Sequence, residues 1–262
     1  MTSIAIIPAR MNSGRFPGKP MKDIRGLSMV GHCMLRTMLC KSLDRVVVAT
    51  PDQLIADHVK SLGGEALVTP EFDMCNDRIA WAYDKVSSQG TKYDLVINVQ
   101  GDQPLVFPEM LDSILAAAKH YPATKSFTMV ESCSTLEDFY DLNRVKVLFR
   151  EKDQMLIYMT RAPIPSPKKK GIVPDKCYKH VAIIAFRPKF LREFLDFGMT
   201  YNESVEGIDY NRVIEMGELM HVSVTDRVTD TVDTQEDLDR VNKIMLKDPL
   251  WTTGVYNAKG LR

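Results

Sequence analysis

Hydrophobic residues near the start of the chain form a short, uninterrupted run. Residues 4–7 lack the polar alternation of a half-exposed strand, and Pro8 follows them. Such a run is typical of a strand buried on both faces, as in a parallel sheet covered by helices. Similar short strands are predicted at 45–50, 66–68 and 95–99.

Helical patterns lie between these strands, at 28–39, 52–62 and 77–86. Strands and helices that alternate with short connections predict an α/β fold, with a mostly parallel central sheet flanked by helices. Right-handed crossovers place the loops that follow the strands on one edge, where ligands of such sheets bind. We therefore expect the loops 9–20 and 100–104 to share that edge.

The pattern loosens after about residue 121, which predicts a smaller segment of mixed structure. Strands are expected there at 127–131, 145–149, 155–159, 180–186 and 221–224, and helices at 137–140, 189–197, 204–216 and 234–246. We expect a single domain over residues 1–247. Residues 248–262 form either a tail or a strap on a partner subunit, and Lys168–Lys170 lie in an exposed loop.

Composition narrows the class of protein. The 262 residues carry 34 basic and 34 acidic side chains, so no global charge favours nucleic acid or an anionic membrane. No apolar run reaches the ~18 residues of a membrane span, and we expect no signal peptide. The five cysteines are scattered, which argues against a zinc site or disulfide framework and for reduced thiols in the cytoplasm.

The loop after the first strand is basic and rich in glycine. It contains Arg10, Arg15 and Lys19 together with Gly14 and Gly18. Glycines allow backbone N–H groups to approach a triphosphate, and fixed cations offset its charge. The loop matches neither the Walker A motif nor the dinucleotide fingerprint, which argues against a hydride-transferring enzyme. The alternative interpretation is a solvated turn.

Several segments together resemble the CTP:3-deoxy-manno-octulosonate (Kdo) cytidylyltransferase family. Residues 9–20 resemble its A-R-x-x-S-x-R-x-P-G-K-P motif, 98–104 its N-V-Q-G-D-E-P motif, 160–165 its S-R-A-x-I-P motif and 232–238 its V-D-T-P-E-D-L motif. The segments occur in the family's order and span nearly the whole chain up to Lys247.

The resemblance implies a Rossmann-like nucleotidyltransferase fold, a homodimer and an activity that transfers CMP from CTP to a Kdo-like sugar acid. This activity belongs to lipopolysaccharide biosynthesis. The residues that it assigns to catalysis are Arg10, Arg15, Lys19 and Asp102. Those that it assigns to the nucleotide are Ala9, Arg10, Ser13, Arg15, Lys19, Thr69, Arg78, Gln100 and Asp102, with Arg78 against the cytosine.

Two carboxylates are candidate ligands of magnesium. Nucleotidyl transfer requires the phosphate charge to be neutralised, usually by Mg²⁺, which prefers one or two carboxylates plus phosphate oxygens and water. Asp102 follows the strand at 95–99 and should face the ligand edge, and the resemblance implies a metal at Asp102 and Asp233. The alternatives are a turn-forming Gly-Asp for Asp102 and a helix N-cap beside Thr234 for Asp233.

The acceptor side departs from the family. Residues 72–78 keep only the final Asp-Arg of H-x-S-G-T-D-R, and residues 180–186 keep the histidine of H-x-G-I-Y-G-Y but lose both tyrosines. The residues assigned to the acceptor are Arg161, His180, Glu203, Glu206 and Tyr210. His180 is alternatively a satisfied structural histidine, and Glu203 and Glu206 a solvated stripe on a helix.

Three functions remain open. The first is a magnesium-dependent cytidylyltransferase that uses a small acidic acceptor of the Kdo type. The second is a cytidylyltransferase for another acid, such as a different nonulosonic acid or a small phosphonate, because changed hydrogen-bond partners change which acid fits. The third is a non-catalytic nucleotide-binding module. The joint presence of Arg15, Lys19, Arg78, Asp102 and Asp233 argues against this module.

Overall fold

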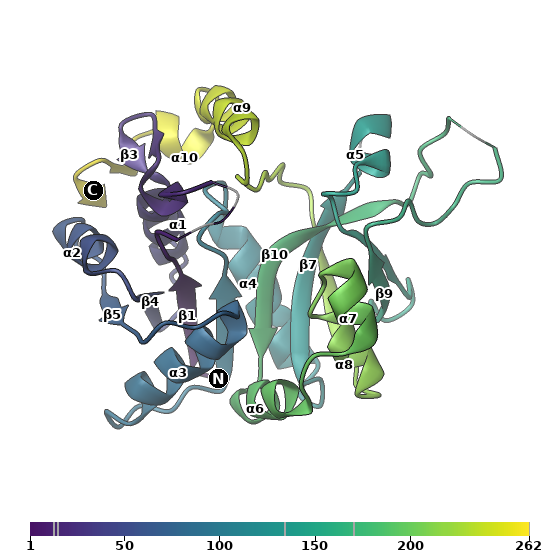
Figure 1. Cartoon of the computed structure of the whole chain (residues 1–262), viewed down its shortest axis with the longest axis horizontal. Coiled ribbons are helices and arrows are strands. Elements are labelled where there is room, and N and C mark those ends of the chain that lie inside the picture. The colour runs from purple at the N-terminus through teal and green to yellow at the C-terminus, as the bar shows by residue number, and fades with distance from the viewer. Residues whose placement is uncertain (13, 15, 134, 170, 262) are drawn as a thin grey trace. The chain divides into compact units, whose positions relative to one another are not determined.

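The computed structural model describes residues 1–12, 14, 16–133, 135–169 and 171–261 (Figure 1). The chain divides into two compact units. Unit 1 comprises Met1–Asp112 and Val228–Arg262, and unit 2 comprises Ser113–Arg227. Among the described residues, no helix combines the length and apolar character that crossing a membrane requires.

Unit 1 contains the parallel sheet that the first part of the sequence predicts. Its strands are β1 (Ser3–Pro8), β4 (Arg45–Thr50), β5 (Ala66–Val68) and β6 (Leu95–Val99). Their order is β6-β1-β4-β5, and every neighbouring pair is parallel. All six residues of β1 are buried, as a strand covered on both faces requires. The predicted α/β fold class is confirmed.

Helices connect these strands and cover the sheet. They are α1 (Met29–Met38), α2 (Gln53–Ser61) and α3 (Cys75–Ser87). The helices α1 and α2 pack on β4, and α3 packs on β1 and β4. Right-handed crossovers in this strand order place α1 and α2 on one face and α3 on the other. Nine residues of α1 are buried, so its packing stabilises the unit more than its helix propensity does.

Shorter elements surround this core. The loop after β1 leads through a 3₁₀ turn, η1 (Lys19–Met21), to the hairpin strands β2 (Asp23–Ile24) and β3 (Leu27–Ser28). The C-terminal part of the unit forms α9 (Gln235–Met245), α10 (Pro249–Thr252), β12 (Tyr256–Asn257) and β13 (Gly260–Leu261).

The segment after residue 247 is anchored to α1. The buried Arg36 donates two hydrogen bonds to Asp248, at 2.8 and 3.0 Å, and one to Tyr256 at 3.1 Å. His32 hydrogen-bonds to the same tyrosine hydroxyl at 2.9 Å. Removing one partner of a buried ion pair strongly destabilises a protein, because the other charge stays buried without compensation. Residues 248–261 are therefore packed onto their own chain. The expectation of one domain ending at residue 247 stays a prediction.

Unit 2 is built on a mixed sheet. The strand β7 (Ser126–Ser132) pairs in parallel with β11 (Met220–Thr225) and antiparallel with β10 (Tyr178–Phe186). Antiparallel pairs extend this sheet through β8 (Lys146–Phe149) to β9 (Leu156–Thr160). The mixed segment expected after residue 121 is confirmed.

The helices of this region differ from expectation in two places. The single helix predicted at 204–216 is wrong: the chain forms α7 (Tyr201–Glu206) and α8 (Asn211–Glu215), separated by Gly207 at φ +63°. A residue in this left-handed conformation ends a helix. The sequence interpretation also missed α4 (Pro108–His120), whereas α5 (Leu136–Tyr140) and α6 (Pro188–Phe197) lie close to the predicted positions.

Candidate active site

Three segments of unit 1 that are far apart in the sequence meet beyond the ends of β1 and β6. The backbone N–H of Val232 donates to the carbonyl of Asp102 at 3.1 Å, and Nε2 of Gln103 donates to Oγ1 of Thr231 at 2.5 Å. These bonds hold the segment before α9 beside the loop that follows β6. The carboxylates of Asp102 and Asp233 thereby approach the lysine of the basic loop.

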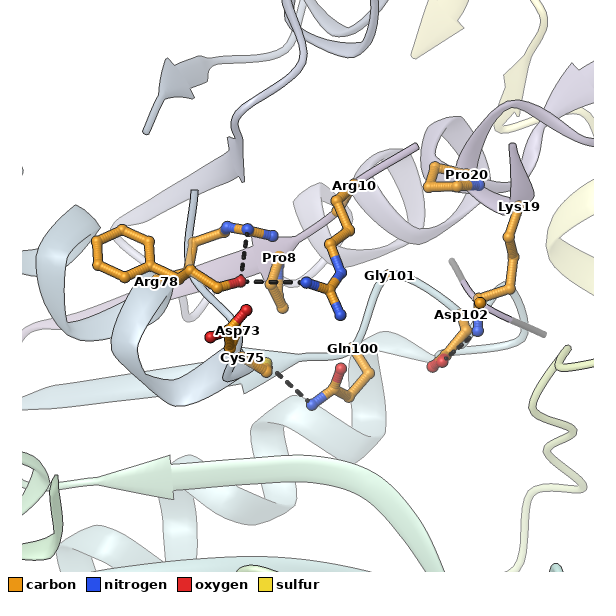
Figure 2. A pocket seen from close by; sticks show the side chains of 13 residues that line it. Pro8, Arg10, Lys19, Pro20, Asp73, Cys75, Arg78, Gln100, Gly101 and Asp102 are labelled. Carbon is orange, nitrogen blue, oxygen red and sulfur yellow. Dashed lines mark hydrogen bonds and ion pairs between the residues drawn. The ribbon is translucent and has the colours of Figure 1, made fainter. Parts of the chain in front are cut away.

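A cavity of about 450 Å³ opens at this edge, and we call it the strand-end pocket. Its volume lies in the range of small-molecule sites. Figure 2 shows cationic, amide and carboxylate side chains around it. The lining residues are Pro8, Ala9, Arg10, Gly14, Lys19, Pro20, Phe72, Asp73, Cys75, Arg78, Gln100, Gly101 and Asp102.

Lys19 joins the two candidate metal ligands. Its Nζ donates to Oδ2 of Asp102 at 2.8 Å and to Oδ1 of Asp233 at 2.9 Å. Burial of the ammonium lowers the pKa of Lys19, but the two carboxylates outweigh burial and raise it above its ordinary value. Lys19 is therefore a cation at neutral pH.

One oxygen of Asp102 has no hydrogen-bond partner among the described residues. This atom, Oδ1, is buried. A buried polar atom without a partner costs free energy and calls for a ligand or water. The Asp233 carboxylate faces the same lysine and does not cap α9, because Thr234 does so by accepting from the N–H of Asp237 at 3.2 Å. The N-cap interpretation of Asp233 is therefore wrong.

Two arginines meet at one backbone oxygen on the opposite side of the pocket. Nη1 of Arg10 and Nη2 of Arg78 donate to the carbonyl of Phe72, at 3.1 and 3.3 Å (Figure 2). Arg78 is only 3% exposed, and its Nε has no hydrogen-bond partner among the described residues. Burial, and secondarily the charge of Arg10, lower the pKa of Arg78. Two guanidinium groups this close favour an anionic or acceptor-rich ligand.

Gly101 keeps the loops after β1 and β6 in close contact. A Cβ atom at this position would lie 2.5 Å from the carbonyl oxygen of Pro8, a distance that side chains do not tolerate. Only glycine lets the two loops approach so closely, which places Asp102 beside the basic loop.

The structure brings together most of the residues assigned to the nucleotide. Ala9, Arg10, Lys19, Arg78, Gln100 and Asp102 line the strand-end pocket. Thr69 is not among the lining residues, and its hydroxyl donates to the carbonyl of Pro70 at 2.8 Å. Ser13 and Arg15 lie outside the described residues.

The acceptor candidates lie in unit 2, where several bind to one another. Glu206 accepts from Oγ1 of Thr160 at 2.6 Å and from the backbone N–H of Arg161 at 2.9 Å. The Arg161 guanidinium donates to the carbonyls of Glu206 and Leu142, at 2.6 and 3.0 Å. These contacts tie the end of β9 to the end of α7.

Glu203 forms a buried ion pair. It is 3% exposed, and its two oxygens accept from Nη2 and Nε of Arg212, at 2.5 and 2.9 Å. The interpretation of Glu203 as part of a solvated stripe is therefore wrong. His180 hydrogen-bonds to Thr128 at 2.8 Å, and its ring lies 5.8 Å from that of Tyr210. Burial lowers the pKa of His180 to about 4, so the ring is neutral at pH 7.

Sequence reasoning missed several contributors to the pocket. The carbonyl of Phe72 orients both arginines, but backbone atoms leave no residue-type signal in a sequence. Asp73 and Cys75 also line the pocket. Asp73 lies in the loop before α3 and Cys75 is the first residue of the helix. This position is the signal that could have identified them, because strand-to-helix loops at this edge carry ligand contacts.

The donor set at Asp102 and Asp233 fits magnesium. The described residues contain no group of three or more His, Cys, Asp or Glu side chains able to hold a metal, so a dedicated protein cage is absent there. Two carboxylates beside a pocket suit Mg²⁺, which takes its remaining ligands from phosphate and water. The unused Oδ1 of Asp102 supplies a donor atom. The sheet edge, the cations and this carboxylate pair together define the class of protein, a nucleotide-binding enzyme that transfers phosphorus-containing groups.

Comparison with known proteins specifies the family. A family model described as cytidylyltransferase matches residues 4–225. The 3-deoxy-manno-octulosonate cytidylyltransferase of Thermodesulfovibrio yellowstonii is 34% identical over 94% of this chain and 98% of its own. That of Yersinia pseudotuberculosis is 36% identical over 94% and 99%. The mitochondrial enzyme of that name from Arabidopsis thaliana is 34% identical over 92% of this chain and 82% of its own.

Solved structures with similar folds support the same family. The structure of CMP:2-keto-3-deoxy-manno-octonic acid synthetase complexed with CTP superposes with a TM-score of 0.85 and 28% identity, covering 94% of this chain and 99% of that one. A 4-diphosphocytidyl-2C-methyl-D-erythritol synthase from Anaerococcus prevotii, 15% identical with a TM-score of 0.60, shares the fold. The chain belongs to the 3-deoxy-manno-octulosonate cytidylyltransferases of the cytidylyltransferase family.

Proposed function

We propose that the protein transfers CMP from CTP to 3-deoxy-manno-octulosonate and releases pyrophosphate, with magnesium as cofactor. The observation that carries this proposal is the position of Lys19 between Asp102 and Asp233, in a pocket that also holds Arg10 and Arg78. This arrangement supplies cations for a triphosphate and carboxylates for a metal. The relatives named above supply the identity of the two substrates.

Lys19, Arg10 and, from the sequence, Arg15 hold the triphosphate. Asp102 and Asp233 would hold the metal, which when bound neutralises phosphate charge at the reacting centre. As the phosphates enter, the ammonium of Lys19 exchanges a carboxylate partner for a phosphate oxygen. Arg78 contacts the base, for which its Nε remains available.

The transfer is a displacement at the α-phosphorus. The anomeric hydroxyl oxygen of the acid forms a bond to this atom, and the bond from the α-phosphorus to the oxygen that bridges to the β-phosphate breaks. Pyrophosphate leaves with the bonding electrons, and the hydroxyl proton passes to solvent. The protein contributes by positioning the reactants and by neutralising charge, which are the main sources of catalysis in such transfers.

The direct test is pyrophosphate release from CTP and Mg²⁺ with 3-deoxy-manno-octulosonate, with other nonulosonic acids and with small phosphonates in parallel. We expect release that depends on both CTP and the first acid. Release with another acid alone would keep the nucleotide half of the proposal and replace the acceptor. Tight CTP binding without release from any acid would indicate a non-catalytic module.

We also infer a homodimer formed through unit 2. The exposed apolar side chains Phe197, Met199, Tyr201 and Val205 follow one another from the end of α6 through α7, and Tyr201 is 81% exposed. Neighbouring apolar side chains of this size are typical of a protein interface. Sedimentation of the wild type and of Tyr201→Asp should show a dimer and a monomer, respectively.

The proposed location is the cytoplasm. All five cysteines are thiols that form no disulfide, which supports a reducing location.

A further inference from the structure

Cys75 is the first residue of α3 and lines the strand-end pocket, where it is partly exposed. Its Sγ accepts hydrogen bonds from Nε2 of Gln100 at 3.3 Å and from Nδ2 of Asn98 at 3.6 Å. The two donors are two positions apart at the end of β6, so they lie on the same side of the chain. The sulfur therefore accepts hydrogen bonds from two side-chain amides beside the strand-end pocket.

This contact fixes the direction of the Gln100 amide. A carboxamide donates through its nitrogen and accepts through its oxygen, and a half-turn of the group exchanges the two. In Figure 2 the nitrogen of Gln100 faces Cys75, and the oxygen is turned away from the sulfur, on the side of Arg10. With its nitrogen engaged, Gln100 presents an acceptor to the pocket.

The guanidinium of Arg78, which also lines the pocket, presents only donors. The guanidinium of Arg78 is buried, and its Nε–H has no partner among the described residues. A guanidinium cannot accept a hydrogen bond. A ligand that satisfies both side chains must therefore offer acceptors to Arg78 and a donor to the oxygen of Gln100.

This pattern separates two kinds of pyrimidine. Cytosine has an exocyclic amine, which donates, next to a ring nitrogen and a carbonyl that accept. Uracil has a carbonyl in place of the amine and an N–H in place of the ring nitrogen. A freely turning Gln100 could serve either base, whereas a fixed acceptor favours cytosine.

We propose that Cys75 is a positioning residue that orients the Gln100 amide and thereby makes the strand-end pocket select an aminopyrimidine over an oxopyrimidine nucleotide. The inference rests on the proposed function only in placing the nucleotide base in this pocket. Cys75 acts through Gln100 and takes no part in the transfer step.

The test compares the wild type with Cys75→Ala and Cys75→Ser. For each protein, kcat/KM is measured for CTP and for UTP with Mg²⁺ and 3-deoxy-manno-octulosonate. We expect the CTP/UTP ratio of Cys75→Ala to fall about tenfold, the effect of one mismatched hydrogen bond, through KM more than through kcat. Cys75→Ser should keep most of the ratio, because its hydroxyl oxygen accepts from the same amide.

The matched control is Cys40→Ala, which removes a thiol outside the pocket. Sγ of Cys40 donates to Oδ1 of Asp112 at 3.4 Å, so we expect its loss to affect stability and leave the CTP/UTP ratio unchanged. Thermal unfolding establishes that each variant is folded. An unchanged ratio in folded Cys75→Ala, or an equal loss in the serine and alanine variants, would overturn the proposal.

Equilibrium binding separates this inference from the proposed function. The ratio of the dissociation constants for CTP and UTP, measured by calorimetry without an acceptor, reports base selection without the transfer step. A wild type that binds CTP selectively but releases no pyrophosphate would contradict the proposed function and leave the role of Cys75 supported if Cys75→Ala loses that selectivity. A wild type that binds both nucleotides equally would overturn the role of Cys75.

Discussion

The charged side chains of the two units are used differently. In unit 1, Asp102 and Arg78 line a cavity and retain atoms, Oδ1 and Nε, that bind no other described residue. In unit 2, Glu203 and Arg212 are buried to a similar or greater degree, yet both oxygens of the glutamate are bound by the arginine. The first arrangement is incomplete without a ligand, and the second is complete within the protein.

This contrast indicates where a ligand binds. Burial of a charged or polar atom costs free energy unless a partner compensates it. Partners from the same chain mark a group that holds the fold together, whereas an unused atom beside a cavity marks a group kept for something else. By this criterion the charged side chains of the strand-end pocket in unit 1 are available to bind a nucleotide. Most of the acceptor candidates in unit 2 instead stabilise the fold.

The largest expected effect is that of Asp102→Asn. The substitution keeps the shape of the side chain and removes the charge that would hold the metal and that binds Lys19. We expect the rate of pyrophosphate release to fall by at least about 10³-fold, as when a main electrostatic contact to the transition state is removed. The melting temperature should change little, because Asp102 is not part of the core.

The control for this prediction is Asp57→Asn, an exposed aspartate of α2 whose carboxylate accepts only from Nε2 of Gln53 among the bonds of the described residues. It should leave the rate unchanged. Near-normal release by Asp102→Asn would contradict the assignment of the metal and remove the main difference between the two units.

The next effect is on stability in unit 2. Arg212→Ala leaves the Glu203 carboxylate buried without its partner, and we expect the free energy of unfolding to fall by about 3–5 kcal/mol. Urea unfolding measures this loss. Adding Glu203→Leu to the alanine variant should recover part of it, because the unpaired charge is then gone. If Arg212→Ala were as stable as the wild type and had a raised KM for the acid, the pair would belong to the acceptor site.

The fold was predictable where one local signal dominated. The strands β4 and β6 lie at the predicted residues, because short, mostly apolar runs between turn residues leave few alternatives. The helix predicted at 204–216 was wrong because its periodicity continues across Gly207, whose left-handed backbone breaks it. The missed α4 did carry a signal, with Pro108 at its first position before an apolar periodic stretch.

For the site, only the types of the residues and their positions after the ends of strands could be predicted. Charged residues that follow β1 and β6 were expected at one edge, and Arg10, Lys19 and Asp102 indeed line one pocket. The partner of each charge could not be predicted. Lys19 reaches Asp233 because distant segments are joined by the bond from Gln103 to Thr231, and Glu203 pairs with Arg212 through the arrangement of α7 and α8.

A smaller effect is expected of pH on the free energy of unfolding. Burial lowers the pKa of His180 from about 6.5 to about 4, so the folded protein favours the neutral ring. This stabilisation is complete above pH 6.5 and is lost as the pH falls towards 4. Relative to His180→Gln, the free energy of unfolding of the wild type should therefore fall by about 2–3 kcal/mol between pH 7.5 and 4.5. A difference independent of pH would show that folding leaves the pKa of the ring unchanged, and a difference that increases as the pH falls from 7.5 would show a ring held in its charged form, as in an anion-binding acceptor residue.

The smallest expected effect is that of Glu206→Gln. One oxygen of the carboxylate accepts from the hydroxyl of Thr160 and the other from the N–H of Arg161, and the single oxygen of an amide can keep one of these bonds. We expect a loss of about 1 kcal/mol in urea unfolding and no change in the KM of the acid acceptor. The opposite result, unchanged stability with a raised KM, would mean that Glu206 gives up its partners to the acid. Unit 2 would then hold ligand-binding charges of the kind found in unit 1, and a charge that is satisfied by its own chain could no longer be taken as purely structural.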